Sequence, residues 1–275
     1  MDAAPPPAPP RVAAPPPLLA DLGLAAPRHP VVLVHGVLGF VRRTLTRLLS
    51  YAYFQGVEDD LADAGVRVTS VALPATACVV DRARALRDAV EGVGGGRVNV
   101  VAHSMGGLDA RWYVGRLGGH RRVASLTTIA TPHHGTYAAD WGGLRVGRAL
   151  AGWRRLADLG VDARAFPDLT RAACEARNAE LLDGPTVPTF SYGGARPWWG
   201  IAAPLQVAFR VLQRVEGPND GLVSVASARF GTYLGTLEAD HFAETGWHWT
   251  PPGVARFDHL GFYRGLVRDL AARGY

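Results

Sequence analysis

The chain has 275 residues, of which 48% are hydrophobic, so it is long and apolar enough for one α/β domain with a buried core. Its formal net charge of +5 comes from dispersed arginines, with no lysine and no basic tract, so a nucleic-acid-binding surface is not expected. The longest nearly apolar run, residues 31–41, is shorter than the roughly 18 residues of a membrane span, so no transmembrane helix is predicted.

Residues 1–29 form a segment rich in proline and alanine. Ten of the 20 prolines lie within the first 30 residues, where they exclude helix interiors and central strands. We therefore expect a flexible or polyproline arm. Prolines and Asp21 interrupt every apolar stretch of this arm before it reaches the about 7 to 15 residues of a secretory signal, so no such signal is expected in this chain.

From residue 31 onward, segments typical of β-strands alternate with segments of helical periodicity. The predicted strands are VVLV from 31, VRVTSVAL from 66, RVNVVAH from 97, RVASLTTIA from 122, VPTFSYGG from 187 and GTYLGTLEA from 231. The predicted helices between them include 79–92, 105–117 and 141–159. A last helix within 258–275 has one apolar stripe and Asp258 as its N-cap. This alternation predicts a mostly parallel sheet covered by helices, in a single domain from residue 30 to 275.

The two cysteines, Cys78 and Cys174, permit one disulfide at most. Two free thiols are an equal alternative, because separation along the chain does not determine the distance between the sulfur atoms.

The stretch NVVAHSMGGLDARW, residues 99–112, leads from apolar strand residues through HSMG into a helical pattern. A serine at such a turn is a nucleophile elbow when the residues two before and two after it are small. Gly106 meets this condition, and Ala102 adds only one methyl group where the usual pattern has its first glycine. We interpret Ser104 as a nucleophile; a serine that only caps the helix is the alternative.

A serine nucleophile needs a base to accept its proton and a carboxylate to orient that base. Asp220 in EGPNDGLVS and His241 in LEADHFAE follow Ser104 in the order serine, acid, histidine that α/β-hydrolases use. Asp240 adjoins His241 and should point away from its ring, and Asp258 is remote, so Asp220 is the preferred acid. The competing histidines come too early in the chain or near its last helix: His133, His134, His248 and His259.

The strand VVLV ends in HGVLGF, which predicts a loop beside the elbow. In a hydrolase of this kind, that loop and the residue after the nucleophile each donate one backbone N–H to an oxyanion. Val37 and Met105 are therefore the predicted donors. Gly36 and Gly39 would act through the shape of the loop, and His35 is interpreted as a hydrogen-bonded organiser of the loop with no catalytic role.

The motifs VVLVHGVLGF, VNVVAHSMGGLDARW, IATPHHGT and EGPNDGLVSVASARFGTYLGTLEADHFAETGW together resemble those of triacylglycerol lipases of the α/β-hydrolase superfamily, the bacterial true lipases and their fungal relatives. The resemblance spans about residues 30–250 and implies the α/β-hydrolase fold. It also implies that Ser104, Asp220 and His241 are the nucleophile, acid and base, and that the two backbone donors named above form the oxyanion hole. No cofactor is implied.

The chain departs from the bacterial lipases where those proteins bind a structural calcium ion. At the position two residues after the histidine, where they carry a carboxylate, this chain has Ala243. The second position falls in PWWGIAAPL, which contains no carboxylate. Glu244 alone cannot supply the several oxygen ligands that calcium requires. We therefore expect no metal site.

Lipases of this type shield the site with a mobile helix after the TPHHGT segment. Residues 141–159 place Leu150, Trp153 and Leu156 at helical spacing, with arginines elsewhere on the wheel. This pattern predicts an amphipathic lid within about residues 137–168 whose apolar face meets a lipid–water interface; an ordinary packed helix is the alternative. The arginine-based positive charge also favours attraction to an anionic lipid surface.

These features predict a serine hydrolase that cleaves carboxylic esters, with acylglycerols as the expected substrates. A carboxylesterase, phospholipase or acyltransferase with the same triad is the alternative, and a non-catalytic lipid carrier is a candidate from a different class. Bacterial members of the family are usually secreted, and some need a dedicated foldase; no motif in this chain indicates either property.

Overall fold

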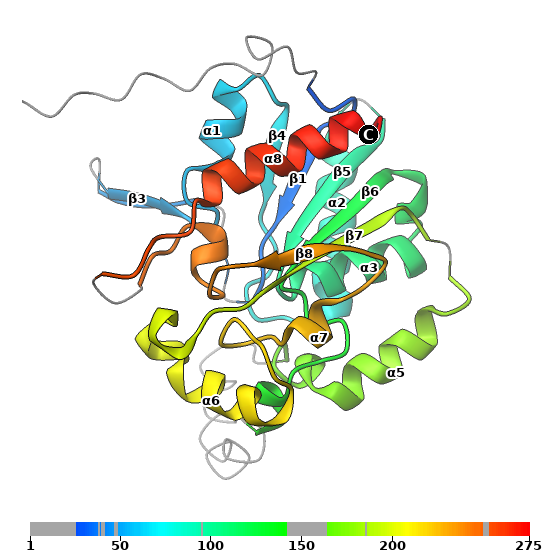
Figure 1. Ribbon diagram of the computed structural model, residues 1–275. Coiled ribbons are helices and arrows are strands. Elements are labelled where there is room, and N and C mark those ends of the chain that lie inside the picture. The colour runs from blue at the N-terminus through cyan, green and yellow to red at the C-terminus, as the bar shows by residue number, and fades with distance from the viewer. Residues whose placement is uncertain are drawn as a thin grey trace, which may run out of the picture.

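The computed structural model describes residues 26–37, 39, 42–46, 49–94, 96–141, 164–184, 186–249 and 253–275. Its centre is a six-stranded sheet in the order β4-β1-β5-β6-β7-β8, in which every neighbouring pair is parallel (Figure 1). The strands are β1 (Val31–Val34), β4 (Val68–Val71), β5 (Val98–His103), β6 (Val123–Ile129), β7 (Thr189–Gly194) and β8 (Thr232–Leu237).

Helices connect these strands and cover the sheet. The α-helices are α1 (Val57–Asp63), α2 (Val79–Gly92), α3 (Gly106–Arg116), α5 (Arg171–Leu181), α6 (Gln206–Val215), α7 (Val225–Ala228) and α8 (His259–Ala272). Short 3-10 turns are η2 (Gly119–Arg121), η3 (Pro167–Leu169), η4 (Trp198–Gly200), η5 (Ala203–Leu205) and η6 (Ala243–Thr245). None of the described helices combines the length and apolar composition that crossing a membrane requires.

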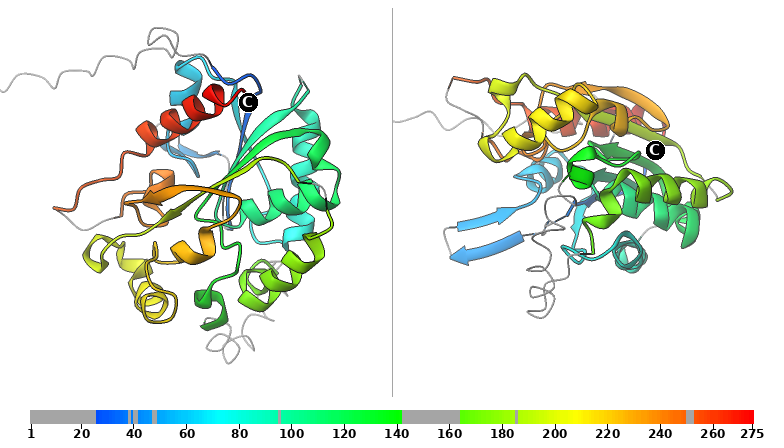
Figure 2. Two further views of the ribbon diagram at one scale, coloured as in Figure 1. Left: turned by 45° about the vertical axis from the view of Figure 1, so that its right-hand side comes forward. Right: turned by 90° about the horizontal axis from the view of Figure 1, so that it is seen from below.

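The sheet is buried on both faces, which explains the unbroken apolar run of β1. Val31 and Leu33 point into one core, which α1 and α8 close, whereas Val32 and Val34 point into a second core with α2 and α3. Successive side chains of a strand alternate between its faces, so a strand covered on both sides is apolar throughout. Figure 2 shows α8 and α1 on one side of the sheet and α2 and α3 on the other.

All six strands predicted from the sequence are present, and α2 and α3 lie where periodicity placed helices. The closing helix is α8, and the Asp258 carboxylate caps it by accepting a 2.9 Å hydrogen bond from the Gly261 N–H. A hairpin of β2 (Arg42–Thr46) and β3 (Leu49–Ala52) was not predicted. Most of the predicted arm, residues 1–25, and most of the predicted lid, residues 142–163, fall outside the described residues.

Both cysteines are free thiols. The buried Cys174 lies with its sulfur 3.5 Å from the carbonyl oxygen of Pro132, whereas Cys78 precedes α2. Of the two alternatives that the sequence left open, the structure therefore contains the unpaired one.

Candidate active site

Ser104 occupies the turn between β5 and α3, at the carboxyl end of a central strand. It is one of two non-glycine residues with positive φ in the described chain, at 56°. This left-handed conformation costs an L-residue roughly 1–2 kcal/mol. Two hydrogen bonds hold it: the Ser104 N–H donates to the Ile129 carbonyl at 2.9 Å, and the Thr131 hydroxyl donates to the Ser104 carbonyl at 2.7 Å. The backbone therefore has the strained strand-to-helix turn that an elbow requires.

Space around the turn explains which neighbours must be glycine. A Cβ atom on Gly106 would lie 2.7 Å from the Val34 carbonyl oxygen, and one on Gly36 would lie 2.8 Å from the Ser104 Cβ. Ala102, by contrast, is fully buried and packs within the core beneath α2 and α3. The methyl group that departs from the usual pattern is thus part of the core and does not enter the turn.

A chain of hydrogen bonds links the serine to the two predicted partners. The Oγ atom of Ser104 lies 3.0 Å from Nε2 of His241, and Nδ1 of the same ring lies 2.8 Å from Oδ2 of Asp220. The other Asp220 oxygen, Oδ1, accepts hydrogen bonds from the N–H groups of Leu222 and Val223 at 2.8 and 2.7 Å. All three side chains are buried, and the carboxylate is fixed by backbone donors.

The competing acids are engaged elsewhere. Asp240 accepts hydrogen bonds from the N–H groups of Ala202 and Ala243, each at 2.8 Å, so it points away from the imidazole of His241 as expected. Burial raises the pKa of the Asp240 carboxyl. Asp258 is the N-cap of α8.

The competing histidines that make hydrogen bonds do so with other partners. His133 contacts the Thr128 hydroxyl at 3.0 Å, and its ring stacks on Phe230. His259 contacts the Gln55 carbonyl oxygen at 2.8 Å. His241 is therefore the imidazole that the structure brings to Ser104.

Val37 and Met105 carry the two N–H groups predicted to form the oxyanion hole. Met105 follows the serine in a right-handed helical conformation, and Val37 lies in the loop after β1. Within the described residues, neither N–H donates to a backbone or side-chain acceptor. Among the described residues, the backbone hydrogen bonding is thus compatible with the predicted role of both N–H groups.

His35 organises the loop after β1, as the sequence suggested. Its Nε2 atom accepts a 3.0 Å hydrogen bond from the Leu73 N–H, so the ring proton sits on Nδ1 and is directed at the Gly36 carbonyl oxygen, 2.8 Å away. Burial lowers the pKa of His35 to about 4, so the ring is neutral at physiological pH. A Cβ atom on Gly39 would collide with this ring, which explains that glycine.

Arg82 is a site residue that sequence reasoning missed. Its fully buried guanidinium donates to the carbonyl oxygens of His35 at 2.7 Å and Gly36 at 3.3 Å, directly before Val37. It also forms a 2.8 Å ion pair with Asp109 on α3. Burial raises the pKa of the Asp109 carboxyl to about 7, and the charge of Arg82 opposes this. One side chain thus ties the loop that carries Val37 to the helix that follows Met105, the two predicted oxyanion donors.

A second buried polar chain, also missed, lies behind the first. The Tyr53 hydroxyl is 2.7 Å from Nδ1 of His103, whose Nε2 is 2.9 Å from Oε2 of Glu244. The His103 and His241 ring centres are 4.6 Å apart. Burial, reinforced by the charges of Asp220 and Asp240, raises the pKa of Glu244 well above its ordinary value. Burial also lowers the pKa of His103, so burial favours the neutral form of both groups.

These residues do not fit a calcium ion. The cluster of metal-ligating side chains in the described chain is His103, His241 and Glu244, which offers one carboxylate and two imidazoles. Calcium takes six to eight oxygen ligands. The segment from Arg196 to Leu205 is instead tied to the histidine loop by the hydrogen bond from Ala202 to Asp240.

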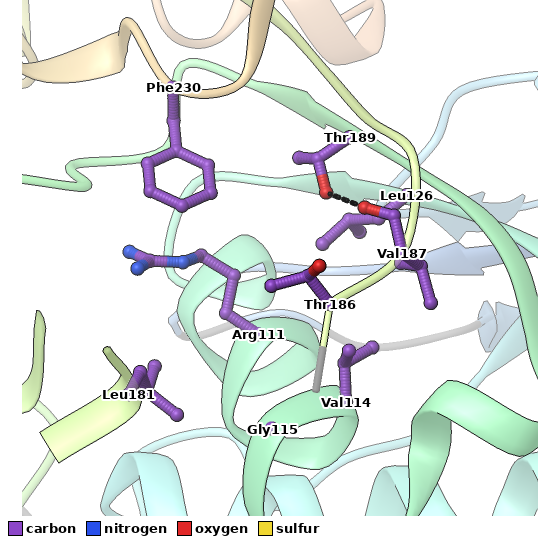
Figure 3. Close-up of a pocket in the computed structure, with 9 residues that line it drawn as sticks. All are labelled: Arg111, Val114, Gly115, Leu126, Leu181, Thr186, Val187, Thr189 and Phe230. Atoms are coloured by element: carbon purple, nitrogen blue, oxygen red, sulfur yellow. Dashed lines mark hydrogen bonds between the residues drawn. The ribbon is translucent and has the colours of Figure 1, made fainter. Parts of the chain in front are cut away.

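A separate small cavity lies between α3, α5, β6 and β7, with a volume of about 70 Å³ (Figure 3). Arg111 reaches across its edge: the guanidinium carbon lies 3.8 Å from the centre of the Phe230 ring, and Nη1 donates to Asn178 at 2.8 Å. Burial lowers the pKa of Arg111 to about 10, which leaves it charged at neutral pH. None of the triad candidates lines this cavity.

Comparison with known proteins places this geometry in a family. A family model described as the α/β hydrolase fold matches residues 29–144. The chain is 30% identical over 259 residues to triacylglycerol lipase 2 of Saccharomyces cerevisiae, with 84% of this chain and 76% of the relative covered. It is also 30% identical over 287 residues to a triacylglycerol lipase of Vibrio cholerae, with 90% and 84% covered.

The chain belongs to the lipase family of the α/β-hydrolase superfamily. Solved lipase structures share its fold. The Staphylococcus hyicus lipase superposes with a TM-score of 0.72 at 19% identity over 90% of this chain and 98% of its own. The mature Bacillus licheniformis lipase gives 0.67 at 23% identity, with 88% and 92% covered. As a member of an enzyme family, this lipase is a hydrolase, and the alternative of a non-catalytic carrier is set aside.

Proposed function

We propose that this lipase-family chain cleaves carboxylic esters through an acyl-enzyme formed on Ser104. The observation that carries the proposal is the pair of hydrogen bonds joining Ser104 to His241 and His241 to Asp220, at 3.0 and 2.8 Å. As the serine oxygen attacks the ester carbonyl carbon, Nε2 of His241 accepts the hydroxyl proton. Asp220 holds the ring in the required tautomer and stabilises the imidazolium that forms.

The negative charge that develops on the ester carbonyl oxygen has to be stabilised by hydrogen-bond donors close to Ser104. The N–H groups of Val37 and Met105 are the proposed oxyanion hole, and their lack of other acceptors in the described chain supports this assignment. His241 then returns the proton to the departing alcohol, and the acyl group remains on Ser104. A water molecule, deprotonated by the same imidazole, releases the carboxylic acid and restores the serine. These steps use only side chains and backbone groups of this chain.

We infer that the physiological esters are acylglycerols presented at a lipid–water interface. The relatives in yeast and Vibrio cholerae, which are named triacylglycerol lipases, support this inference. A carboxylesterase, a phospholipase or an acyltransferase would use the same three side chains. Hydrolysis rates for p-nitrophenyl esters of increasing chain length, for a triglyceride emulsion and for phosphatidylcholine separate these alternatives.

Replacement of the three residues tests the mechanism. Ser104→Ala should lower kcat by about a factor of 10⁶, and Asp220→Asn by about 10⁴. Asp240→Asn is the matched control, because it changes a buried carboxylate adjacent to His241 that does not contact the imidazole. Full turnover by a folded Ser104→Ala variant would refute the nucleophile assignment.

The amphipathic lid stays a prediction, because its central residues lie outside those described. If the predicted helix 141–159 covers the site, activity should rise sharply when a short-chain triglyceride passes from solution into droplets. A smooth saturation curve across that transition would count against a lid.

A further inference from the structure

Two adjacent tryptophans project from the turn η4. Trp198 and Trp199 are 56% and 57% exposed, and their rings meet edge to face with centres 6.2 Å apart. Single exposed apolar side chains are common on protein surfaces, but a pair of large aromatic rings is not. Indole combines an apolar body with a polar N–H, and tryptophan is accordingly enriched where membranes meet water.

The outer face of α6 continues this surface. Val207, Arg210 and Arg214 follow one another at helical spacing and are exposed, whereas Phe209 and Leu212 on the opposite side are buried. A groove lies between η4 and this face of α6, and it is lined by Trp198, Arg210, Arg214, Phe209 and Gln213. In Figure 1, α6 lies at the lower left, beyond the carboxyl end of β7.

The exposed charged side chains of this surface, Arg210 and Arg214, are both positive, and residues 197–215 contain neither aspartate nor glutamate. Glu216, which follows α6, is half-buried and accepts a 2.8 Å hydrogen bond from the Tyr137 N–H. Within the part of the chain that the structure describes, no carboxylate forms an ion pair with Arg210 or Arg214. Two guanidinium groups beside two indoles match the chemistry of an anionic phospholipid layer, with phosphates above and acyl chains below.

The surface adjoins the candidate active site through the segment that carries His241. Phe242 packs against the cluster that contains Leu205 and Phe209, beneath the outer face of α6. Trp249 lies on Phe242, with ring centres 5.1 Å apart, and is also more than half exposed. A lipid layer that met this surface would therefore lie next to the segment that follows the imidazole of the triad.

We propose that the η4 tryptophans and the outer face of α6 form a docking surface for anionic lipid layers. Trp198 and Trp199 enter the headgroup region, and Arg210 and Arg214 contact the lipid phosphates. The proposal rests on the proposed function, since docking serves a hydrolase whose substrate is in the layer. It adds a surface outside the predicted lid and a preference for negatively charged lipid.

The test measures binding without turnover. The full chain carrying Ser104→Ala is sedimented with vesicles of phosphatidylcholine alone or mixed with phosphatidylglycerol. Each arginine near an anionic surface contributes about 1 kcal/mol, so Arg210→Gln with Arg214→Gln should weaken binding to the mixed vesicles about thirtyfold. Binding to neutral vesicles should not change. Trp198→Ser with Trp199→Ser should weaken binding to both kinds by about tenfold or more.

Matched controls separate this surface from general charge and hydrophobicity. Arg84→Gln with Arg87→Gln removes the same charge from α2, where both side chains are exposed. Leu182→Ser removes an apolar side chain that is 80% exposed at the end of α5. Neither should alter vesicle binding by more than about twofold, since charges away from the contact are screened by salt and an apolar side chain away from the contact does not enter the lipid layer.

Four outcomes would overturn the proposal. The first is that the α2 control pair weakens vesicle binding as much as the arginine pair of α6 does, and the second is that both surface variants bind vesicles as the parent does. The third is that inorganic phosphate reduces vesicle binding more than chloride does at equal ionic strength. The fourth is that the chain is a dimer that Trp198→Ser with Trp199→Ser dissociates. Hydrolysis of soluble p-nitrophenyl butyrate by the chain with Ser104 intact tests the proposed function separately. The surface variants should retain that rate, so a failure of docking and a failure of catalysis give different results.

Discussion

Nη2 of Arg82 lies 2.7 Å from the carbonyl oxygen of His35, although 46 residues separate them in the chain. The same guanidinium pairs with Asp109, one helical turn after Met105. The loop that carries Val37 and the helix that follows Ser104 are therefore held at a fixed separation. The two N–H groups of the proposed oxyanion hole would have to be positioned together, and Arg82 links the segments that carry them.

Arg82→Met is expected to lower both stability and turnover. Removal of one partner from a buried ion pair costs about 3–5 kcal/mol, because Asp109 remains unpaired. A displaced oxyanion loop should lower kcat up to about 10²-fold with little change in KM. Chemical denaturation and steady-state hydrolysis of a soluble ester measure the two effects.

The double variant Arg82→Met with Asp109→Leu separates the two effects. It should recover most of the lost stability, since no charge remains buried without a partner, while kcat stays low. Recovery of kcat together with stability would mean that the loop keeps its position without Arg82.

The two small residues around Ser104 should respond differently to substitution. Ala102→Gly removes a buried methyl group worth about 0.8 kcal/mol and adds a strand glycine that costs about 0.5–1 kcal/mol, so the melting temperature should fall while activity persists. Gly106→Ala places a Cβ 2.7 Å from the Val34 carbonyl oxygen and should reduce activity by about 10²-fold or more. Equal activity of both variants would show that the turn tolerates a side chain on its helix side.

The buried carboxyl group of Glu244 should make the free energy of unfolding depend on pH. A carboxyl group whose pKa is higher in the folded than in the unfolded chain binds more protons in the folded state between those two values. Stability therefore falls as pH rises above about 4.5, the ordinary value of Glu244, by up to about 1.4 kcal/mol per pH unit. Glu244→Gln removes this dependence.

Urea denaturation at several pH values measures this effect. The free energy of unfolding of Glu244→Gln, relative to that of the parent, should not change below pH 4.5 and should increase as pH rises above it. All the titratable groups that interact with Glu244 are retained in this variant: His103, His241, Asp220, Asp240, Tyr53 and Tyr263. The exposed Glu238 provides the control, and Glu238→Gln should leave the pH profile unchanged. Parallel profiles for the parent and Glu244→Gln would mean that Glu244 is ionised in the folded protein.

Calcium removal is expected to have no effect. The Asp240 carboxylate joins the segment of Ala202 directly to the loop that follows His241, because it accepts hydrogen bonds from the N–H groups of Ala202 and Ala243. Prolonged treatment with a chelator should leave both the melting temperature and ester hydrolysis unchanged. Loss of activity that added calcium restores would contradict the argument from the donor set.

Local patterns predicted the sheet well, because buried parallel strands are unbroken apolar runs and loops such as HSMG lie at their carboxyl ends. The hairpin β2–β3 was missed because RRTLTRLLSYA contains neither a clear alternation nor a glycine turn. The polar contacts of Arg82 and of His103 were missed for another reason. Asp109 and Glu244 are 27 and 141 residues away from these partners, and no local periodicity pairs side chains across such distances.

The left-handed backbone of Ser104, the proposed nucleophile, has a consequence for each catalytic cycle. The hydrogen bonds to Ile129 and Thr131 fix the backbone of this residue, and the contact with Nε2 of His241 orients its hydroxyl oxygen before any ligand arrives. The entropy of aligning the attacking oxygen is lost once, during folding, and not again at every encounter with an ester. A chain with a relaxed turn at this position would be more stable by about 1–2 kcal/mol but would lose this preorganisation, so part of the folding free energy is given up for speed.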